Sequence, residues 1–459
     1  MVRRITLLCS LLCAAMLIAG GAELMAGAAK RKITPDLKSG VPAYMAGFGN
    51  NRQATGVHDD LWVRCAAISA GAKPVVICGV DVIGIFWDDV QKIRAKVPGA
   101  TVIVAATHVH EGPDTMGMWG PQRGVSGIDN AYNAFVVEQA AAAALDAVAT
   151  MRPANAQMIS VKPKDVAGYF DDSRPPVVND GEILALALND MRRERIATVV
   201  NWANHPEAMG SKNTLITADW PAALYERLEA QDGGTAVYIN GAVGGMQSPL
   251  GAKLTDPKTG KPAAPETFRF ADVVGEYVAG HVIDAIDAAP RAMPVDEIIY
   301  REAVVRIPVA NAGFLAASAA DLFRGRKQMA AEKLSVSPVG YLALKFGGKP
   351  VLEAALIPGE MYPELSVGGV IANDPGADLP GSPVEPPIKG MFTAPFRMLF
   401  GLANDEIGYI IPKSQWDETA PFTFGAKKAW YGEVNSVGPE AAPVIAKTMQ
   451  ELVRGAAKP

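Results

Sequence analysis

The pattern of apolar and polar residues predicts alternating β-strands and helices along most of the chain. Short apolar runs, or runs that alternate every second residue, are typical of strands, whereas longer runs with one apolar face are typical of helices. We predict strands at residues 62–69, 74–80, 101–106, 182–188, 196–202, 235–240, 297–309 and 349–357, and helices at 86–97, 131–151, 268–288 and after the capping residue Asp219. The order favours an α/β fold, with mixed β-sheets and surrounding helices in a single large domain.

The first 28 residues have the pattern of a signal peptide. Arg3 and Arg4 precede an apolar run at residues 5–20, and small residues follow that run. We expect a signal peptide at 1–28, cleaved after Ala22 or Ala28, and a mature domain at 29–459. The protein should then be secreted or periplasmic. A retained membrane anchor is the alternative, although the run is short for a membrane span.

Composition and charge exclude several classes of protein. The chain has 43 Lys and Arg against 48 Asp and Glu, a net charge of −5, and no basic block. We therefore expect no nucleic-acid partner. Gly (45) and Pro (34) together stay below the proportion of about 25–30% that marks low-complexity chains.

Two cysteines remain after the predicted signal peptide. Cys65 and Cys78 lie on neighbouring predicted strands, joined by a turn at residues 70–73. In a tight hairpin the two side chains would lie opposite each other. They form either a cross-strand disulfide, which an exported protein can make, or two small buried thiols.

Unusual polar residues follow several of the predicted strands. His108 and His110 follow the strand at 101–106, His205 follows the strand at 196–202, and Ser248 and Glu360 follow later strands. Ligands of α/β proteins bind beyond the carboxyl ends of strands. A His-x-His pair is compatible with a structural role, but the third histidine favours a zinc site.

Three segments resemble motifs of the neutral (non-lysosomal) ceramidase family. Thr107-His108-Val109-His110-Glu111-Gly112-Pro113 is similar to the family's Thr-His-Thr-His-Ser-Gly-Pro. Asn201-Trp202-Ala203-Asn204-His205-Pro206 resembles its Asn-Trp-Phe-Ala-x-His segment, and Gln247-Ser248-Pro249 resembles the end of its Gly-Asp-Val-Ser-Pro-Asn loop. The stretch 46–66 is similar to the family's Gly-rich start, and order and spacing agree over residues 33–248.

The resemblance implies a zinc-dependent amidase that cleaves an N-acyl bond. Matching the motifs assigns the Zn²⁺ ligands to His108, His205, Glu360 and Tyr409. Tyrosine has an ordinary pKa of about 10, so Tyr409 would need a nearby cation to ionise. Loop capping and packing are the alternative roles of Glu360 and Tyr409.

The resemblance also implies catalytic roles. His110 would handle protons beside the zinc, and Tyr409 would stabilise the oxyanion. Arg174 would contact the substrate, and Ser248 would help to bind or attack the acyl group. A solvated loop arginine and an ordinary turn serine are the alternatives for the last two.

The sequence also departs from the family. Glu111 replaces a small serine, Asp114-Thr115 replace glycines, and Met246 stands at an aspartate position. We expect a catalytic domain without the family's C-terminal β-sandwich. Its substrate would be a small-molecule or lipid N-acyl compound, such as a ceramide-like lipid, reached through transient contact with a membrane surface. The alternatives are the same zinc centre acting on another amide or ester, and a non-catalytic ligand-binding protein.

Overall fold

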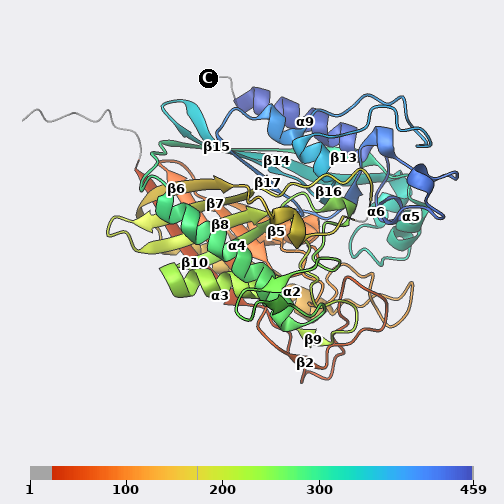
Figure 1. Cartoon of the computed structure of the whole chain (residues 1–459), viewed down its shortest axis with the longest axis horizontal. Helices are drawn as coiled ribbons and strands as arrows, with labels where there is room; N and C mark the ends of the chain where they lie inside the picture. Colours follow the sequence, from red (N-terminus) through yellow and green to blue (C-terminus); the bar gives the residue numbers. More distant parts are fainter. Residues whose placement is uncertain (1–22, 173, 457–459) are drawn as a thin grey trace, which may run out of the picture.

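Two mixed β-sheets pack face to face at the centre of the fold (Figure 1). The computed structural model describes residues 23–172 and 174–456. Side chains of both sheets share one apolar core, in which Ile77, Leu186 and Val237 of one sheet meet Leu342 and Leu356 of the other. Figure 1 shows helix α9 on one side of the stacked sheets and helices α3 and α4 on the other.

The larger sheet has eight strands in the order β10-β8-β7-β6-β1-β3-β4-β5. Their bounds are β1 (Leu24–Lys32), β3 (Trp62–Ala70), β4 (Val75–Val80), β5 (Thr101–Ala106), β6 (Arg152–Val161), β7 (Ile183–Asp190), β8 (Arg195–Trp202) and β10 (Thr235–Asn240). The pairs β4/β5 and β8/β10 are parallel, and the other pairs are antiparallel. The sheet is curved, since β10 at one edge also contacts β3 and β4.

The smaller sheet has the order β13-β14-β15-β17 and is also mixed. Its strands are β13 (Glu297–Pro308), β14 (Leu334–Phe346), β15 (Lys349–Leu356) and β17 (Phe396–Phe400). Two-stranded pairs are formed by β2 (Gly56–Val57) with β9 (Leu215–Ile216), β11 (Thr255–Asp256) with β12 (Lys261–Pro262), and β16 (Glu360–Met361) with β18 (Tyr409–Ile410).

Helices cover the outer faces of the sheets. Helix α2 contacts β1, β3 and β4, helices α3 and α4 pack together over β10, β6 and β7, and α9 covers β13 and β14. The helices are α1 (Trp87–Lys96), α2 (Asn130–Ala149), α3 (Trp220–Asp232), α4 (Phe268–Ala288), α5 (Ala312–Ala319), α6 (Lys327–Glu332), α7 (Pro363–Val367), α8 (Tyr431–Val434) and α9 (Ala441–Ala456). Short 3₁₀ turns lie at η1 (Val166–Tyr169), η2 (Gly244–Met246), η3 (Ile388–Met391), η4 (Lys413–Gln415) and η5 (Thr423–Gly425).

The predicted α/β fold is confirmed, and each predicted strand and helix is present within a few residues of its expected bounds. Strands β1, β6, β14 and β17, the strands of the three two-stranded pairs, and helices α5 to α9 were not predicted. The arginines and apolar run of the predicted signal peptide lie outside the described residues. The predicted boundary between residues 28 and 29 falls inside β1, whose buried residues include Leu24 and Ala26. Among the described residues, no helix is long and apolar enough to span a membrane.

Of the two alternatives for the cysteines, the structure has the disulfide. Cys65 of β3 and Cys78 of β4 are register partners in the hairpin and are bonded to each other. Both are fully buried beneath α2. The alternation of the two strands places the two sulfurs on the same face, as the sequence pattern predicted.

Candidate metal centre

The His-x-His pair lies in the loop that leaves β5. This strand ends at Ala106, and His108 adopts a left-handed backbone conformation with φ +70°, which residues other than glycine adopt infrequently. The His108 N–H donates to the Val82 carbonyl (3.1 Å), and the His110 N–H donates to the Pro206 carbonyl (3.0 Å). The second bond joins this loop directly to the segment that carries His205.

His205 lies in the loop after β8, and Asn240 at the end of β10 fixes this loop against the first one. The buried Asn240 amide donates from Nδ2 to the carbonyls of Thr107 (3.0 Å) and Asn204 (3.1 Å). Each of these residues directly precedes a site histidine. Because β8 and β10 are parallel neighbours, their carboxyl ends meet at one edge of the sheet. Asn240 was not predicted as a site residue.

Backbone carbonyls fix the ring nitrogens of two histidines. Nδ1 of His108 lies 2.7 Å from the Ile83 oxygen, and Nδ1 of His205 lies 2.7 Å from the Gln247 oxygen. A carbonyl oxygen only accepts hydrogen bonds, so each Nδ1 carries the proton. In the neutral ring the lone pair is then on Nε2, and both Nε2 atoms face Glu360 Oε2, at 3.4 Å for His108 and 3.1 Å for His205.

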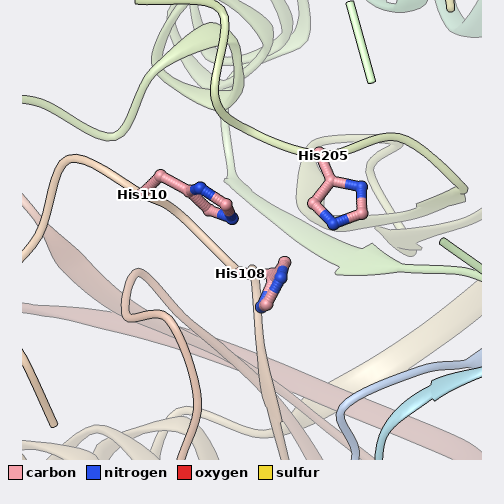
Figure 2. A group of neighbouring side chains, drawn as sticks. All are labelled: His108, His110 and His205. Carbon is pink, nitrogen blue, oxygen red and sulfur yellow. The ribbon is translucent and has the colours of Figure 1, made fainter. Parts of the chain in front are cut away.

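The third histidine has a different environment. The candidate ligand atoms of His108, His110 and His205 all lie within 4.8 Å of one another, and Figure 2 shows the three imidazoles around one point. Nδ1 of His110 is 3.2 Å from Glu207 Oε2, but within the described part of the chain neither ring nitrogen has a hydrogen-bond partner. Burial, together with the charges of His108 and His205, lowers the pKa of His110 well below its ordinary value.

Glu360 and Tyr409 reach the site on the paired strands β16 and β18. The two residues are register partners in this parallel pair, and both are buried. Burial alone would raise the pKa of Glu360, but His108 and His205 lower it far below the ordinary range. The Tyr409 ring lies among the rings of Tyr362 and Tyr431. Burial and the charge of Glu360 raise the pKa of the Tyr409 hydroxyl well above 10.

The arrangement fits a divalent cation. Two imidazoles with their Nε2 atoms directed at one carboxylate, and a third imidazole without hydrogen bonds, are the donors that zinc takes in proteins. Burial opposes protonation of His205, but its hydrogen bond to Glu360 and the charges of Glu207 and Glu360 raise its pKa to about 8. Without a cation, protonated His205 would pair with the ionised Glu360.

An apolar cavity of about 170 Å³ opens beside these residues. His108, His110, Glu360 and Tyr409 are among its polar lining residues. Much of the remaining lining is aromatic or sulfur-containing, with Phe86, Met116, Met118, Trp119, Phe314 and Phe323. Such a cavity can hold an apolar group and exclude water from the polar side.

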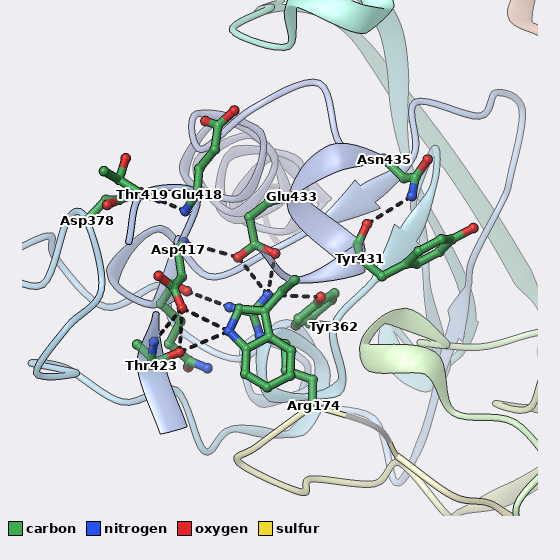
Figure 3. Close-up of polar contacts among 12 residues, drawn as sticks. Arg174, Tyr362, Asp378, Asp417, Glu418, Thr419, Thr423, Tyr431, Glu433 and Asn435 are labelled. Atoms are coloured by element: carbon green, nitrogen blue, oxygen red, sulfur yellow. Dashed lines mark hydrogen bonds and ion pairs between the residues drawn. The ribbon is translucent and has the colours of Figure 1, made fainter. Parts of the chain in front are cut away.

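Arg174 is neither a solvated loop residue nor part of the cavity lining. It is buried, and its Nη1 lies 2.6 Å from both carboxylate oxygens of Glu433 and 3.3 Å from the Tyr362 hydroxyl (Figure 3). Its Nη2 donates to the Gln415 carbonyl at 2.7 Å. The Tyr362 hydroxyl and the Glu433 carboxylate raise the Arg174 pKa despite burial. The ion pair with Glu433 ties the loop after β6 to α8. Arg174 thus supports Tyr362, which packs against Tyr409.

Ser248 lies next to the site but is held in a turn. Its Oγ accepts the Leu250 N–H (3.1 Å), and its backbone forms a two-way bridge with Asp171. It does not line the cavity. The neighbouring Gln247 supplies the carbonyl that holds His205, so this loop acts on the site through its backbone.

Buried acids lie behind His110 and were not predicted as site residues. Glu111 and Glu207 are almost fully buried, and Arg52 Nη1 is 3.5 Å from Glu111. Burial and the charges of Asp219 and Glu207 raise the Glu111 pKa well above its ordinary value, although Arg52 opposes this. In the sequence, Glu111 was visible only as a departure from the family motif.

Comparisons with known proteins agree with this geometry at the level of fold. Neither protein-family models nor curated protein sequences match the chain. Among solved structures, neutral ceramidase from Pseudomonas aeruginosa superposes with a TM-score of 0.69 over 95% of this chain and 75% of its own, at 17% sequence identity. A ceramidase complexed with C2 gives 0.68 over 94% and 75%, at 16% identity. The fold of this protein is therefore the neutral ceramidase fold, which confirms the resemblance seen in its motifs.

Proposed function

We propose that this protein is a zinc-dependent hydrolase of N-acyl (amide) bonds that works outside the cytoplasm. The observation that carries the proposal is the convergence of His108, His205 and Glu360 beside the apolar cavity. These three residues, with Tyr409 as the fourth, would hold the zinc. When bound, zinc supplies Lewis acidity, which lowers the pKa of water and polarises a carbonyl oxygen.

The chain's own residues provide the remaining functions. His110 lines the cavity, and its lowered pKa keeps its ring neutral near pH 7, so the ring can accept a proton and later pass it to the leaving amine. Glu207 lies close enough to Nδ1 of His110 to orient this ring. The aromatic wall of the cavity would hold the apolar part of the substrate and keep water away from the scissile bond.

Three features support an exported protein that meets lipid substrates. The Cys65–Cys78 disulfide is typical of oxidising compartments, and the arginine-led apolar run at the N-terminus is typical of a signal peptide. Tyr431 belongs to the cavity lining and is half exposed, and the neighbouring Val434 is equally exposed. Apolar side chains at this position suit transient contact with a membrane or micelle.

Metal analysis coupled to hydrolysis tests the proposal. The purified protein should bind one zinc per chain and hydrolyse N-acyl amides faster as the acyl chain lengthens. Chelation should abolish the activity, and added zinc should restore it. Ester analogues of the same length show whether the centre prefers amides. A protein that binds no stoichiometric zinc, or that binds acyl compounds without cleaving them, would overturn the enzymatic function.

A further inference from the structure

Glu406 is a buried acid in the wall of the apolar cavity, and protein contacts satisfy only half of its carboxyl group. The side chain is 4% exposed, and Oε1 accepts the Gly408 N–H at 2.7 Å. Oε2 is buried and, among the described residues, has no hydrogen-bond partner. A buried polar atom without a partner is costly, so its presence in a cavity wall points to a ligand.

The neighbouring charged residues do not supply that partner. Arg326 also lines the cavity, but its guanidinium bonds to Asp405 and stacks 4.3 Å from the centre of the Phe86 ring. Asp405 further accepts the Trp87 N–H (3.0 Å) and the Ser337 hydroxyl (2.6 Å). Of the two adjacent acids, Asp405 thus has both carboxylate oxygens bonded to protein groups, whereas Glu406 has one oxygen that can bond to a molecule in the cavity.

Local packing holds Glu406 at this position. A Cβ atom on Gly84 would lie 3.1 Å from the Glu406 Cγ and 2.5 Å from the Met116 sulfur. Because glycine has no side chain, the side chains of Glu406 and Met116 can pack at this position. Gly84 follows Ile83, whose carbonyl holds His108. Glu406, Met116 and His108 therefore line the same part of the cavity, around Ile83 and Gly84.

We propose that the second carboxyl oxygen of Glu406 binds a hydrogen-bond donor, a hydroxyl or an amine, carried by the apolar part of the amide substrate. This proposal rests on the proposed amide hydrolase function. It narrows the substrate class to N-acyl compounds that bear such a group close to the scissile bond. Burial and the charges of Glu360 and Asp405 raise the Glu406 pKa well above its ordinary value. A hydroxyl suits either state of the carboxyl group, because it donates to an ionised Oε2 and accepts from a protonated one.

Matched substrates that differ in one group test this inference. One set holds dodecanoyl amides of propylamine, ethanolamine and ethylenediamine, which end in methyl, hydroxyl and ammonium. A second set compares 3-hydroxydodecanoyl and dodecanoyl propylamide. In at least one set the wild type should prefer the polar member about tenfold in kcat/KM. Calorimetry on the metal-free protein should show the same preference in binding.

Three variants assign the preference to Glu406. Glu406→Leu fills the space without a polar group, and it should reduce the preference to within about twofold. Glu406→Gln retains an oxygen for the Gly408 N–H, and it should keep a preference for hydroxyl but lose one for ammonium. Glu385→Leu is the matched control, because Glu385 is also a buried acid that accepts one backbone N–H and has one unpartnered oxygen, away from this cavity.

The outcomes separate this inference from the proposed function. Equal preferences in the wild type and Glu406→Leu, or a wild type that binds the members of both sets equally, would overturn the inference. A preference in binding without hydrolysis of any amide by the zinc-loaded protein would instead overturn the proposed function and leave the Glu406 site in place. Melting curves confirm that each variant is folded before its preference is compared.

Discussion

At the scale of single residues, the site depends on hydrogen bonds that fix which ring nitrogen faces inward. The carbonyls of Ile83 and Gln247 hold the Nδ1 protons of two histidines, and Asn240 joins the loops that carry them. His110 has no such carbonyl partner and instead lies near Glu207. This difference predicts different roles for residues that are only two positions apart.

We expect the His108→Ala and His205→Ala variants to lose zinc, and His110→Ala to retain it. The first two remove donors that face Glu360, whereas the third removes a proton-handling group, so its activity should fall by about 10²–10⁴-fold. Zinc content and turnover of the three purified proteins check this expectation. Equal zinc loss in all three would indicate a three-histidine site and would weaken the assignment of Tyr409 as a ligand.

The environment of Asp81, away from the candidate metal centre, predicts that stability depends on pH. This fully buried carboxylate accepts the Trp62 N–H (2.9 Å) and the Tyr225 hydroxyl (3.0 Å). Burial outweighs these bonds and the charge of Arg64, and it raises the Asp81 pKa to about 6. Between the ordinary pKa of about 3.9 and this value, the folded state binds more protons than the unfolded state, so stability falls as pH rises.

In the Asp81→Asn variant the side chain at position 81 does not titrate, so this loss of stability with rising pH should be absent. A shift of about two pKa units corresponds to about 3 kcal/mol. The unfolding free energy of Asp81→Asn relative to the wild type should therefore rise by about 3 kcal/mol between pH 4 and pH 7. Urea unfolding at several pH values measures this difference, and a difference that is constant with pH would contradict the assignment.

At the scale of elements, the sequence predicted the strands with continuous apolar runs or regular alternation and missed several whose pattern is irregular. Strand β5 was predicted residue for residue, because each of its positions is apolar except Thr101. The first part of strand β1, residues 24–28, was assigned to the signal peptide, since these residues are small or apolar in both contexts. Only the pairing of β1 with β3 along its whole length shows that these residues form a strand of the folded domain. This is tertiary information that composition does not carry.

Gly27 in the middle of β1 shows how closely this strand meets α2. A Cβ atom at this position would lie 2.2 Å from the Ala147 carbonyl oxygen and 2.7 Å from the Met151 nitrogen. Both are backbone atoms and cannot rotate away, so Gly27→Ala should lower the unfolding free energy by about 1–3 kcal/mol. Gly280→Ala in α4 is the control, since a Cβ there meets no atom within 4 Å and should be neutral or stabilising. A neutral Gly27→Ala variant would show that β1 is not seated against α2.

The same strand predicts where the mature chain begins. Cleavage after Ala22 keeps β1 intact, whereas cleavage after Ala28 removes the buried Leu24 and Ala26 together with half of its pairing with β3. We expect a chain that begins at Glu23 to fold and one that begins at Ala29 to be insoluble. Mass spectrometry of the folded protein, expressed from the full sequence, locates the terminus, and a folded product that begins at Ala29 would contradict this prediction.

At the scale of the whole molecule, the site is assembled from both sheets. The histidines could be predicted, because each follows an apolar strand and lies in a recognisable motif. Glu207, Asn240 and Glu406 could not, because their importance comes from loops that meet only in the folded chain. Arg174 illustrates the same limit, since its partner Glu433 is 259 positions away in the sequence.

Asn201 joins the two sheets and predicts how they unfold. From β8 its amide donates to the carbonyls of Ile239 (3.0 Å) and Leu399 (2.8 Å), and its oxygen accepts the Leu399 N–H at 3.1 Å. The Asn201→Ala variant would leave buried polar groups of Leu399 on β17 without partners, so it should lower the unfolding free energy by about 3–5 kcal/mol. Asn189→Ala, which removes a single bond to Gln157 within the larger sheet, should cost only about 1 kcal/mol.

The shape of the unfolding transition carries the stronger test. The two sheets share one apolar core, so neither can expose its inner face without the other losing its cover. Asn201→Ala should therefore still unfold in one transition, with the same midpoint by far-ultraviolet circular dichroism and by tryptophan fluorescence. The strand that carries Asn201 also leads to His205, which the substitution leaves in place, so we expect zinc to raise this midpoint in both the variant and the wild type. Two separate transitions would show that the smaller sheet can unfold, together with Glu360 and Glu406 in the segments that follow its strands, while the larger sheet and its histidines stay folded.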